Sequence, residues 1–190
     1  MSFRVVVDSC CEVSENLRGN ERIVSVPLGL QIGDVFFVDD KNLVQKELLE
    51  HIAAYEGCPK SSCPSPEAFM EAYHCDAERV YVITLSSKLS GSYNSAVLGK
   101  ELYRETYGEK DIHIVDSHSA SAGMTAQLLE IFRLEEQGLS FAEISEAIEV
   151  DLNLTMEAKD TAKDSTTQML LLKIGGSWYI TGDFLETISQ

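Results

Sequence analysis

Residues 80–96 read VYVITLSSKLSGSYNSA. The first four residues are apolar or aromatic and rich in β-branching, which predicts a short buried strand. A loop of hydroxyl side chains containing Gly91 follows, and residues 93–107 have the pattern of a helix. Such a turn gathers backbone N–H groups, hydroxyls and the positive end of the helix dipole around one point. It suits a carboxylate or a phosphate, although an ordinary serine-capped turn between a strand and a helix has the same pattern.

Strand and helix patterns alternate on both sides of this stretch. A polar loop at residues 60–66 leads into a helix that Ser65 caps and Pro66 begins. Alternation of this kind predicts an α/β fold, with a mainly parallel sheet and helices on both faces. The expected strands are residues 3–7, 23–26, 35–38, 80–84 and 112–115, and the expected longer helices are residues 42–55, 66–73, 93–107, 122–137 and 141–150.

Polar residues end several of these strands or lead into the helices. Because ligands of parallel α/β sheets bind beyond the carboxyl ends of the strands, we expect the polar loops to converge on one crevice. The loops concerned are Asp8-Ser9, Ser61-Ser62, residues 86–92 and residues 116–121.

The pattern changes after residue 150. Residues 168–174 and 178–181 flank Gly175-Gly176, which is a β-hairpin signal. The sequence therefore predicts a domain at residues 1–150 and a short antiparallel β appendage at residues 151–190.

The composition excludes several classes of partner. The formal charge is −16, which argues against nucleic-acid binding and against docking on anionic lipid. The sequence has neither an apolar run of membrane-spanning length nor a basic-then-apolar leader, so we expect a cytoplasmic protein without membrane insertion.

All five cysteines fall within the first 75 residues, and the odd number and the adjacent Cys10-Cys11 pair favour reduced thiols. Cys58, Cys63 and the His74-Cys75 pair lack the CxxC or HxxxH spacing of a zinc site. We therefore expect no metal and no redox chemistry.

Five motifs occur in a characteristic order over residues 1 to about 150. They are the first strand with Asp8-Ser9, Pro27-Leu28 followed by Asp39, the KSSCPSP segment at residues 60–66, the SSKLSGSYNSA segment at residues 86–96, and Val115-Asp116-Ser117 with Ser121 and Gly123. Together these motifs resemble the DegV family of bacterial fatty-acid-binding proteins.

The resemblance implies a protein that holds the carboxylate of a long-chain fatty acid and presents it to a partner kinase, without being an enzyme and without a cofactor of its own. By motif position, Ser61 replaces the usual threonine of the family, Ser62 follows it, and Ser90 matches the head-group serine. Neutral hydroxyls and amides can bind a carboxylate without a buried cation. The complete expected ligand-binding set is Ser61, Ser62, Ser90, Gly91, Ser117 and Ser121.

The last forty residues do not resemble the C-terminal half of that family, and no histidine follows His118. Two other interpretations therefore stay open. The chain could be a truncated or recombined domain with only a structural or dimerising role. It could also be a serine hydrolase using Ser90 with Asp116 and His118, although a Gly-x-Ser-x-Gly elbow is missing. Apolar surface left by the absent half predicts a homo-oligomer.

Overall fold

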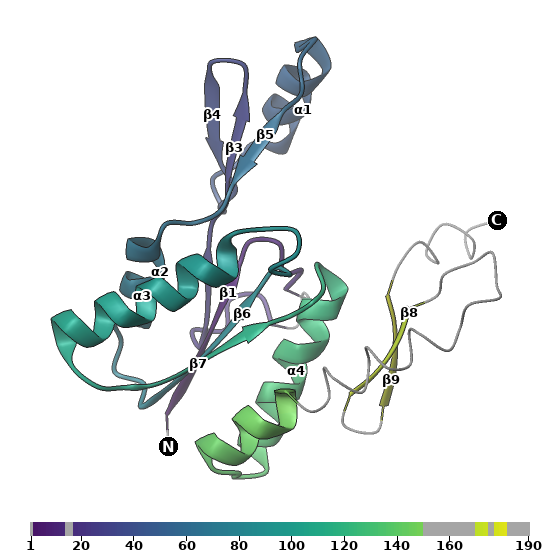
Figure 1. Cartoon of the computed structure of the whole chain (residues 1–190). Helices are drawn as coiled ribbons and strands as arrows, with labels where there is room; N and C mark the ends of the chain where they lie inside the picture. The colour runs from purple at the N-terminus through teal and green to yellow at the C-terminus, as the bar shows by residue number, and fades with distance from the viewer. Residues whose placement is uncertain (1, 14–16, 150–169, 175–176, 182–190) are drawn as a thin grey trace.

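The computed structural model describes residues 2–13, 17–149, 170–174 and 177–181 (Figure 1). Its main unit is a four-stranded parallel sheet. Across the sheet the order is β2 (Ile23–Val26), β1 (Phe3–Asp8), β6 (Arg79–Thr84) and β7 (Asp111–Asp116). The expected parallel sheet is confirmed.

The two central strands carry side chains into two separate cores, because successive residues of a strand point to opposite faces. Val5 and Val7 belong to the core under α4 (Ala122–Glu136) and the helix at residues 141–149. Val6 belongs to the core under α2 (Pro66–Tyr73) and α3 (Ser92–Tyr107). Helices thus cover both faces of the sheet, as expected (Figure 1).

A second, smaller unit projects from this body, and we call it the arm (Figure 1). It contains an antiparallel sheet with the order β4-β3-β5 and one helix, α1. The bounds are β3 (Gly29–Ile32), β4 (Val35–Val38), α1 (Gln45–Ala54) and β5 (Lys60–Ser62).

The arm corrects two details of the sequence interpretation. Residues 60–62 are not a loop, because they pair with β3, Ser61 opposite Leu30 and Ser62 opposite Gly29. The helix begins at Gln45 and not directly after Asn42, whose backbone and side chain bond to Asp40 instead.

Other local expectations are confirmed. The Ser65 hydroxyl accepts a hydrogen bond from the amide of Ala68 at 3.3 Å, with Pro66 in the first turn of α2. At the carboxyl end of the chain, β8 (Leu170–Ile174) and β9 (Ser177–Thr181) pair as an antiparallel hairpin. The remainder of the predicted appendage lies outside the described residues.

Helices α2 and α3 touch closely at Gly99. A Cβ added there would lie 2.7 Å from the carbonyl oxygen of Pro66 and 2.9 Å from the Cβ of Phe69. Because the nearest atom belongs to the backbone of α2, it cannot move aside as the end of a long side chain could. Tyr73 strengthens the same contact by donating to the carbonyl of Ala96 at 3.0 Å.

Replacing Gly99 with alanine tests this contact. The helix propensity of alanine favours the variant by about 1 kcal/mol, but overpacking costs about 1–3 kcal/mol. We expect Gly99→Ala to lower the free energy of unfolding, measured by urea denaturation. Thr106→Ala, at an exposed position of the same helix, is the control and should leave stability equal or slightly higher. An unchanged or raised stability of Gly99→Ala would contradict the close contact.

Candidate functional site

Asp8 lies at the carboxyl end of β1, beside the carboxyl end of β6. The chain leaves these two neighbouring strands toward opposite sides of the sheet, and this is the position where ligands of open α/β sheets bind. The Asp8 carboxylate is fully buried, and burial raises its pKa against the lowering effect of its hydrogen bonds. Its oxygens accept from the amides of Leu85 at 2.6 Å and Cys10 at 3.1 Å, and it also bonds to the side chain of Ser92.

The serine-rich loop after β6 folds back on itself before α3 begins. The amide of Ser90 donates to the carbonyl of Ser86 at 3.0 Å. The Ser90 oxygen accepts from the amide of Ser92 at 3.2 Å and lies 3.0 Å from the Ser92 oxygen. Gly91, the N-cap residue of α3, supplies no side chain to the helix end. The Ser90 hydroxyl and the amino end of α3 therefore lie together at the surface.

The end of β5 meets this loop through Cys63. A Cβ on Gly91 would lie 3.1 Å from the sulfur of Cys63, and that sulfur is 3.6 Å from the hydroxyl oxygen of Ser95. Ser61 and Ser62, which directly precede Cys63, are exposed. The structure thus brings the Ser61-Ser62 strand and the Ser90-Gly91 loop to one place.

Ser61 and Ser62 point to opposite faces of the arm sheet. A Cβ on Gly29 would lie 2.5 Å from the Ser62 oxygen and 2.4 Å from the ring of Phe36, so Ser62 and Phe36 share one face. Because side chains alternate along a strand, Ser61 is on the other face, with its cross-strand partner Leu30. The hydroxyls of Ser61 and Ser62 therefore point in different directions.

The loop after β7 holds the last two expected residues. Ser117 is buried, and its hydroxyl donates to the carbonyl of Ser119 at 3.0 Å and accepts from the amide of the same residue at 3.1 Å. Ser121 is exposed, with a φ of 52°, and its hydroxyl donates to the carboxylate of Glu12 at 3.1 Å. Ser117 shapes the loop, and Ser121 faces an acidic neighbour.

Asp116 and His118 are paired in the same loop. The ring Nδ1 of His118 lies 3.5 Å from a carboxylate oxygen of Asp116, whose other oxygen accepts from the amide of Ser87 at 2.9 Å. The hydroxyl of Ser90, by contrast, bonds to Ser92. The geometry of these described residues does not join the nucleophile of the hydrolase interpretation to its base.

The expected ligand-binding set omitted two residues of this region, Asp8 and Cys63. The dipeptide Asp8-Ser9 after a buried strand was a usable signal for the first. The second had none, because the contact between Cys63 and Gly91 joins segments far apart in the sequence. Cys63 approaches only because residue 91 carries no side chain.

Other features of the described residues do not add a site. No three His, Cys, Asp or Glu side chains among them are grouped to hold a metal ion. Burial raises the pKa of the Cys10 thiol to about 11, which keeps it protonated at neutral pH. A surface hollow lined by Glu78, Tyr103 and Lys110, among others, lies at the amino ends of β6 and β7, the opposite edge of the sheet. No described helix has the length and apolar character needed to cross a bilayer.

A parallel α/β body with an antiparallel arm and hydroxyl-rich loops at its carboxyl edge defines a class of α/β proteins. Comparison with family models narrows this class. The model of the DegV family (uncharacterised protein, DegV family COG1307) matches residues 2–153. The chain belongs to the DegV family.

Individual relatives agree with this assignment. DegV domain-containing proteins of Streptococcus pneumoniae and Streptococcus pyogenes are 37% and 40% identical over 150 residues, which is 78% of this chain and 53% of each relative. The chain spans about half the length of these curated relatives.

Solved structures share the fold. A DegV family protein from Ruminococcus gnavus with vaccenic acid has a TM-score of 0.78 and 42% identity, and the match covers 95% of this chain and 72% of that one. The Fatty Acid Kinase (Fak) B3 protein of Streptococcus pneumoniae, loaded with linoleic acid, has a TM-score of 0.74 and 35% identity, covering 80% of this chain and 55% of that one.

Asp116 allows a pH test of the loop after β7. Burial acts to raise the pKa of Asp116, but the hydrogen bonds from Ser87 and His118 outweigh it, and the pKa lies below its ordinary value. Its contribution to stability is therefore present above the unfolded pKa, about 4, and is lost as pH falls through the folded pKa.

We expect Asp116→Asn to be less stable than the parent by about 1–2 kcal/mol at pH 7, and the difference to shrink as the pH is lowered below 4. Urea denaturation at several pH values measures it. Thr106→Ala, which changes no titratable group, is the control and should differ from the parent equally at every pH. A pH-independent difference for Asp116→Asn would contradict the lowered pKa.

Proposed function

We propose that this chain binds the carboxylate of a long-chain fatty acid at the carboxyl edge of its parallel sheet and presents it to a partner kinase. One observation carries the proposal: Cys63 packs against Gly91, so the end of β5 meets the amino end of α3 beside the Ser90 hydroxyl. In this assignment Ser90 and Gly91 contact the carboxylate from one side, and Ser61 or Ser62 from the other.

The chemistry of the donors supports an anionic head group. The amino end of a helix and neighbouring hydroxyls donate to a carboxylate, and charge-assisted bonds of this kind are stronger than neutral ones. Local donors are needed because the chain as a whole carries a charge of −16, which does not attract anions at long range. In this proposal Ser117 and Ser121 contribute indirectly, by shaping the loop after β7. Ser117 is buried and hydrogen-bonded within that loop.

Two of the similar structures support the ligand class and the partner in this proposal. The Ruminococcus gnavus protein holds vaccenic acid, and the Streptococcus pneumoniae protein is a Fatty Acid Kinase (Fak) B3 protein loaded with linoleic acid. Ser61, Ser62 and Gly91 are exposed, so a carboxylate bound among them would remain accessible to a second protein. Addition of a fatty acid kinase and ATP to the loaded chain should give acyl phosphate, and no transfer would reject the presenting role.

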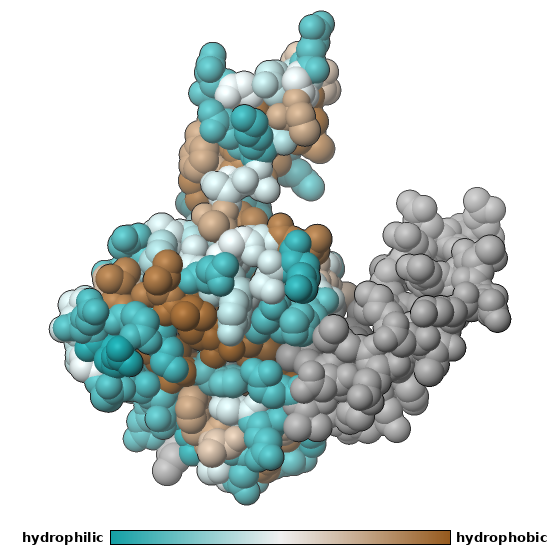
Figure 2. Space-filling view, viewed as in Figure 1, coloured by the Kyte–Doolittle hydropathy of each residue, from teal (hydrophilic) through white to brown (hydrophobic). Residues whose placement is uncertain are grey.

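A long acyl tail needs a further wall. Several large apolar side chains of the described residues are exposed. Phe36 and Leu49 on the arm and Leu98 on α3 are each more than half exposed, and Figure 2 shows apolar surface over α3 and on the arm. We propose that a second copy of the chain covers this surface when ligand is bound.

Ser90→Ala tests the head-group assignment. Loss of a charge-assisted hydrogen bond costs about 1.5–3 kcal/mol, so we expect affinity for a fatty acid to fall about tenfold or more. Fluorescence or calorimetric titration with oleate measures it.

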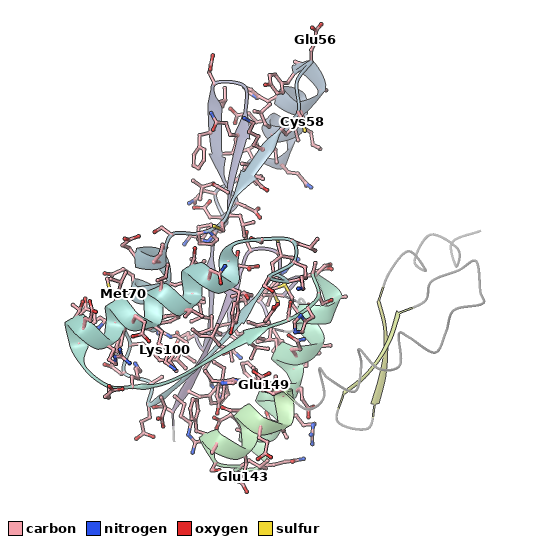
Figure 3. The ribbon with its side chains drawn as sticks, in the orientation of Figure 1. Glu56, Cys58, Met70, Lys100, Glu143 and Glu149 are labelled. Carbon is pink, nitrogen blue, oxygen red and sulfur yellow. The ribbon has the colours of Figure 1, made fainter. Side chains whose placement is uncertain are left out.

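The matched control is Ser140→Ala. Ser140 also forms a hydrogen-bonded helix cap, with Glu143, and Figure 3 shows Glu143 at the end of the body away from the arm. The Ser140→Ala variant should bind oleate as tightly as the parent does. A Ser90→Ala variant with unchanged affinity would remove Ser90 from the site.

The proposal about the acyl tail is tested by sedimentation in the presence of ligand. Each uncovered methylene forfeits about 0.8 kcal/mol, so a monomer that leaves half of a twelve-methylene stretch exposed loses about 5 kcal/mol, more than a thousandfold in affinity. We expect weak binding by the monomer and tight binding only by an oligomer. A monomer that binds with submicromolar affinity would contradict the need for a second copy.

A further inference from the structure

The last residue of β1 and the two residues after it contact the loops that follow β2, β6 and β7 at the carboxyl edge of the sheet. Asp8 binds the loop after β6 through the amide of Leu85. The carbonyl of Cys10 accepts from the amide of Ser121 at 3.0 Å, in the loop after β7. Between them, the hydroxyl oxygen of Ser9 accepts from the amide of Leu28 at 3.1 Å, where the chain enters the arm.

The bond from Leu28 to Ser9 lies at the root of the arm. Leu28 directly precedes β3, is buried, and its carbonyl accepts from the amide of Asp39 at 2.9 Å, where the chain leaves β4. The amide of Ser9 also donates to the carbonyl of Val26 at 3.1 Å. Ser9 thus holds the end of β2 and the beginning of the arm against the body.

The position of the arm determines the position of Ser61 and Ser62. Both residues are on β5, which pairs with β3 immediately after Leu28. The opposite wall, Ser90, is held separately: Asp8 bonds to the side chain of Ser92, which in turn bonds to Ser90. The dipeptide Asp8-Ser9 therefore holds one wall with each of its two side chains.

We infer that Ser9 is a positioning residue, which sets the separation between the Ser61-Ser62 strand and the Ser90 loop through its bond to Leu28. This inference rests on the proposed function, because it assigns Ser9 a role in the same head-group site. Ser9 acts through the backbone of the arm and not by contact with the carboxylate. The single bond between Leu28 and Ser9 matters because a hydrogen bond to a ligand loses strength when its donor is displaced.

The test compares Ser9→Ala, Ser9→Thr and Ser140→Ala with the parent. Alanine removes the acceptor for the Leu28 amide, whereas threonine keeps it. Ser140→Ala removes a hydrogen-bonded cap at the other end of the body and controls for a general loss of stability. Oleate affinity, the melting temperature and hydrogen exchange of the Leu28 amide are measured on each full-length chain.

We expect Ser9→Ala to bind oleate about tenfold more weakly and to lose protection of the Leu28 amide. Ser9→Thr should keep the oleate affinity and the protection of the Leu28 amide within about twofold of the parent. Ser140→Ala should lower the melting temperature without lowering affinity.

The outcomes separate the inference from the proposed function. If the parent binds oleate and Ser9→Ala binds it equally well, the positioning role is wrong and the proposed function stands. If Ser9→Ala and Ser140→Ala lose affinity in proportion to their melting temperatures, the role of Ser9 is only structural. A parent that binds no fatty acid in any oligomeric state rejects the proposed function, and the inference with it.

Discussion

The buried carboxylate of Asp8 is the constraint on which the carboxyl edge of this protein depends. A buried charge without hydrogen-bond partners is strongly unfavourable. Asp8 avoids this cost only while the amides of Leu85 and Cys10 and the side chain of Ser92 point toward it. The loop after β1, the loop after β6 and the first turn of α3 must therefore take up one mutual arrangement.

That arrangement also reconciles a buried aspartate with a neighbouring site for an anion. Like charges repel strongly at short range in a protein interior, and a free carboxylate beside the ligand would oppose binding. The Asp8 oxygens are surrounded by donors, the amides of Leu85 and Cys10 and the side chain of Ser92, so its charge is compensated within the protein. In the proposed site the donors at the amino end of α3 face the ligand. The same network that stabilises Asp8 therefore keeps Ser90 in place.

The sequence predicts the body of the protein well and the arm poorly, for a physical reason. In β1 and β6 the strand signal is local, because runs of β-branched residues are buried on both faces. The Ser65 cap of α2 is an equally local signal. In β5 the signal is absent, because Lys60, Ser61 and Ser62 are polar and exposed and become a strand only by pairing with β3. Pairing between distant segments depends on tertiary structure that propensity does not report.

The candidate site divides in the same way. The hydroxyl loop of residues 86–92 was visible as a candidate site from its local pattern, and its convergence with Ser61-Ser62 was expected. The contact that joins them was not visible, since it depends on the missing side chain of Gly91 and the sulfur of Cys63. Family resemblance indicated Ser61 together with Ser90, but it could not indicate that Ser61 and Ser62 open to opposite faces of a strand. Only one of those two hydroxyls can face a given carboxylate. In the proposed function the head group is recognised by a few donors in fixed positions, while most of the binding free energy of a long-chain acid must come from burying its methylenes. The donors would then decide the identity and orientation of the ligand, and the surface that covers the tail would decide its affinity.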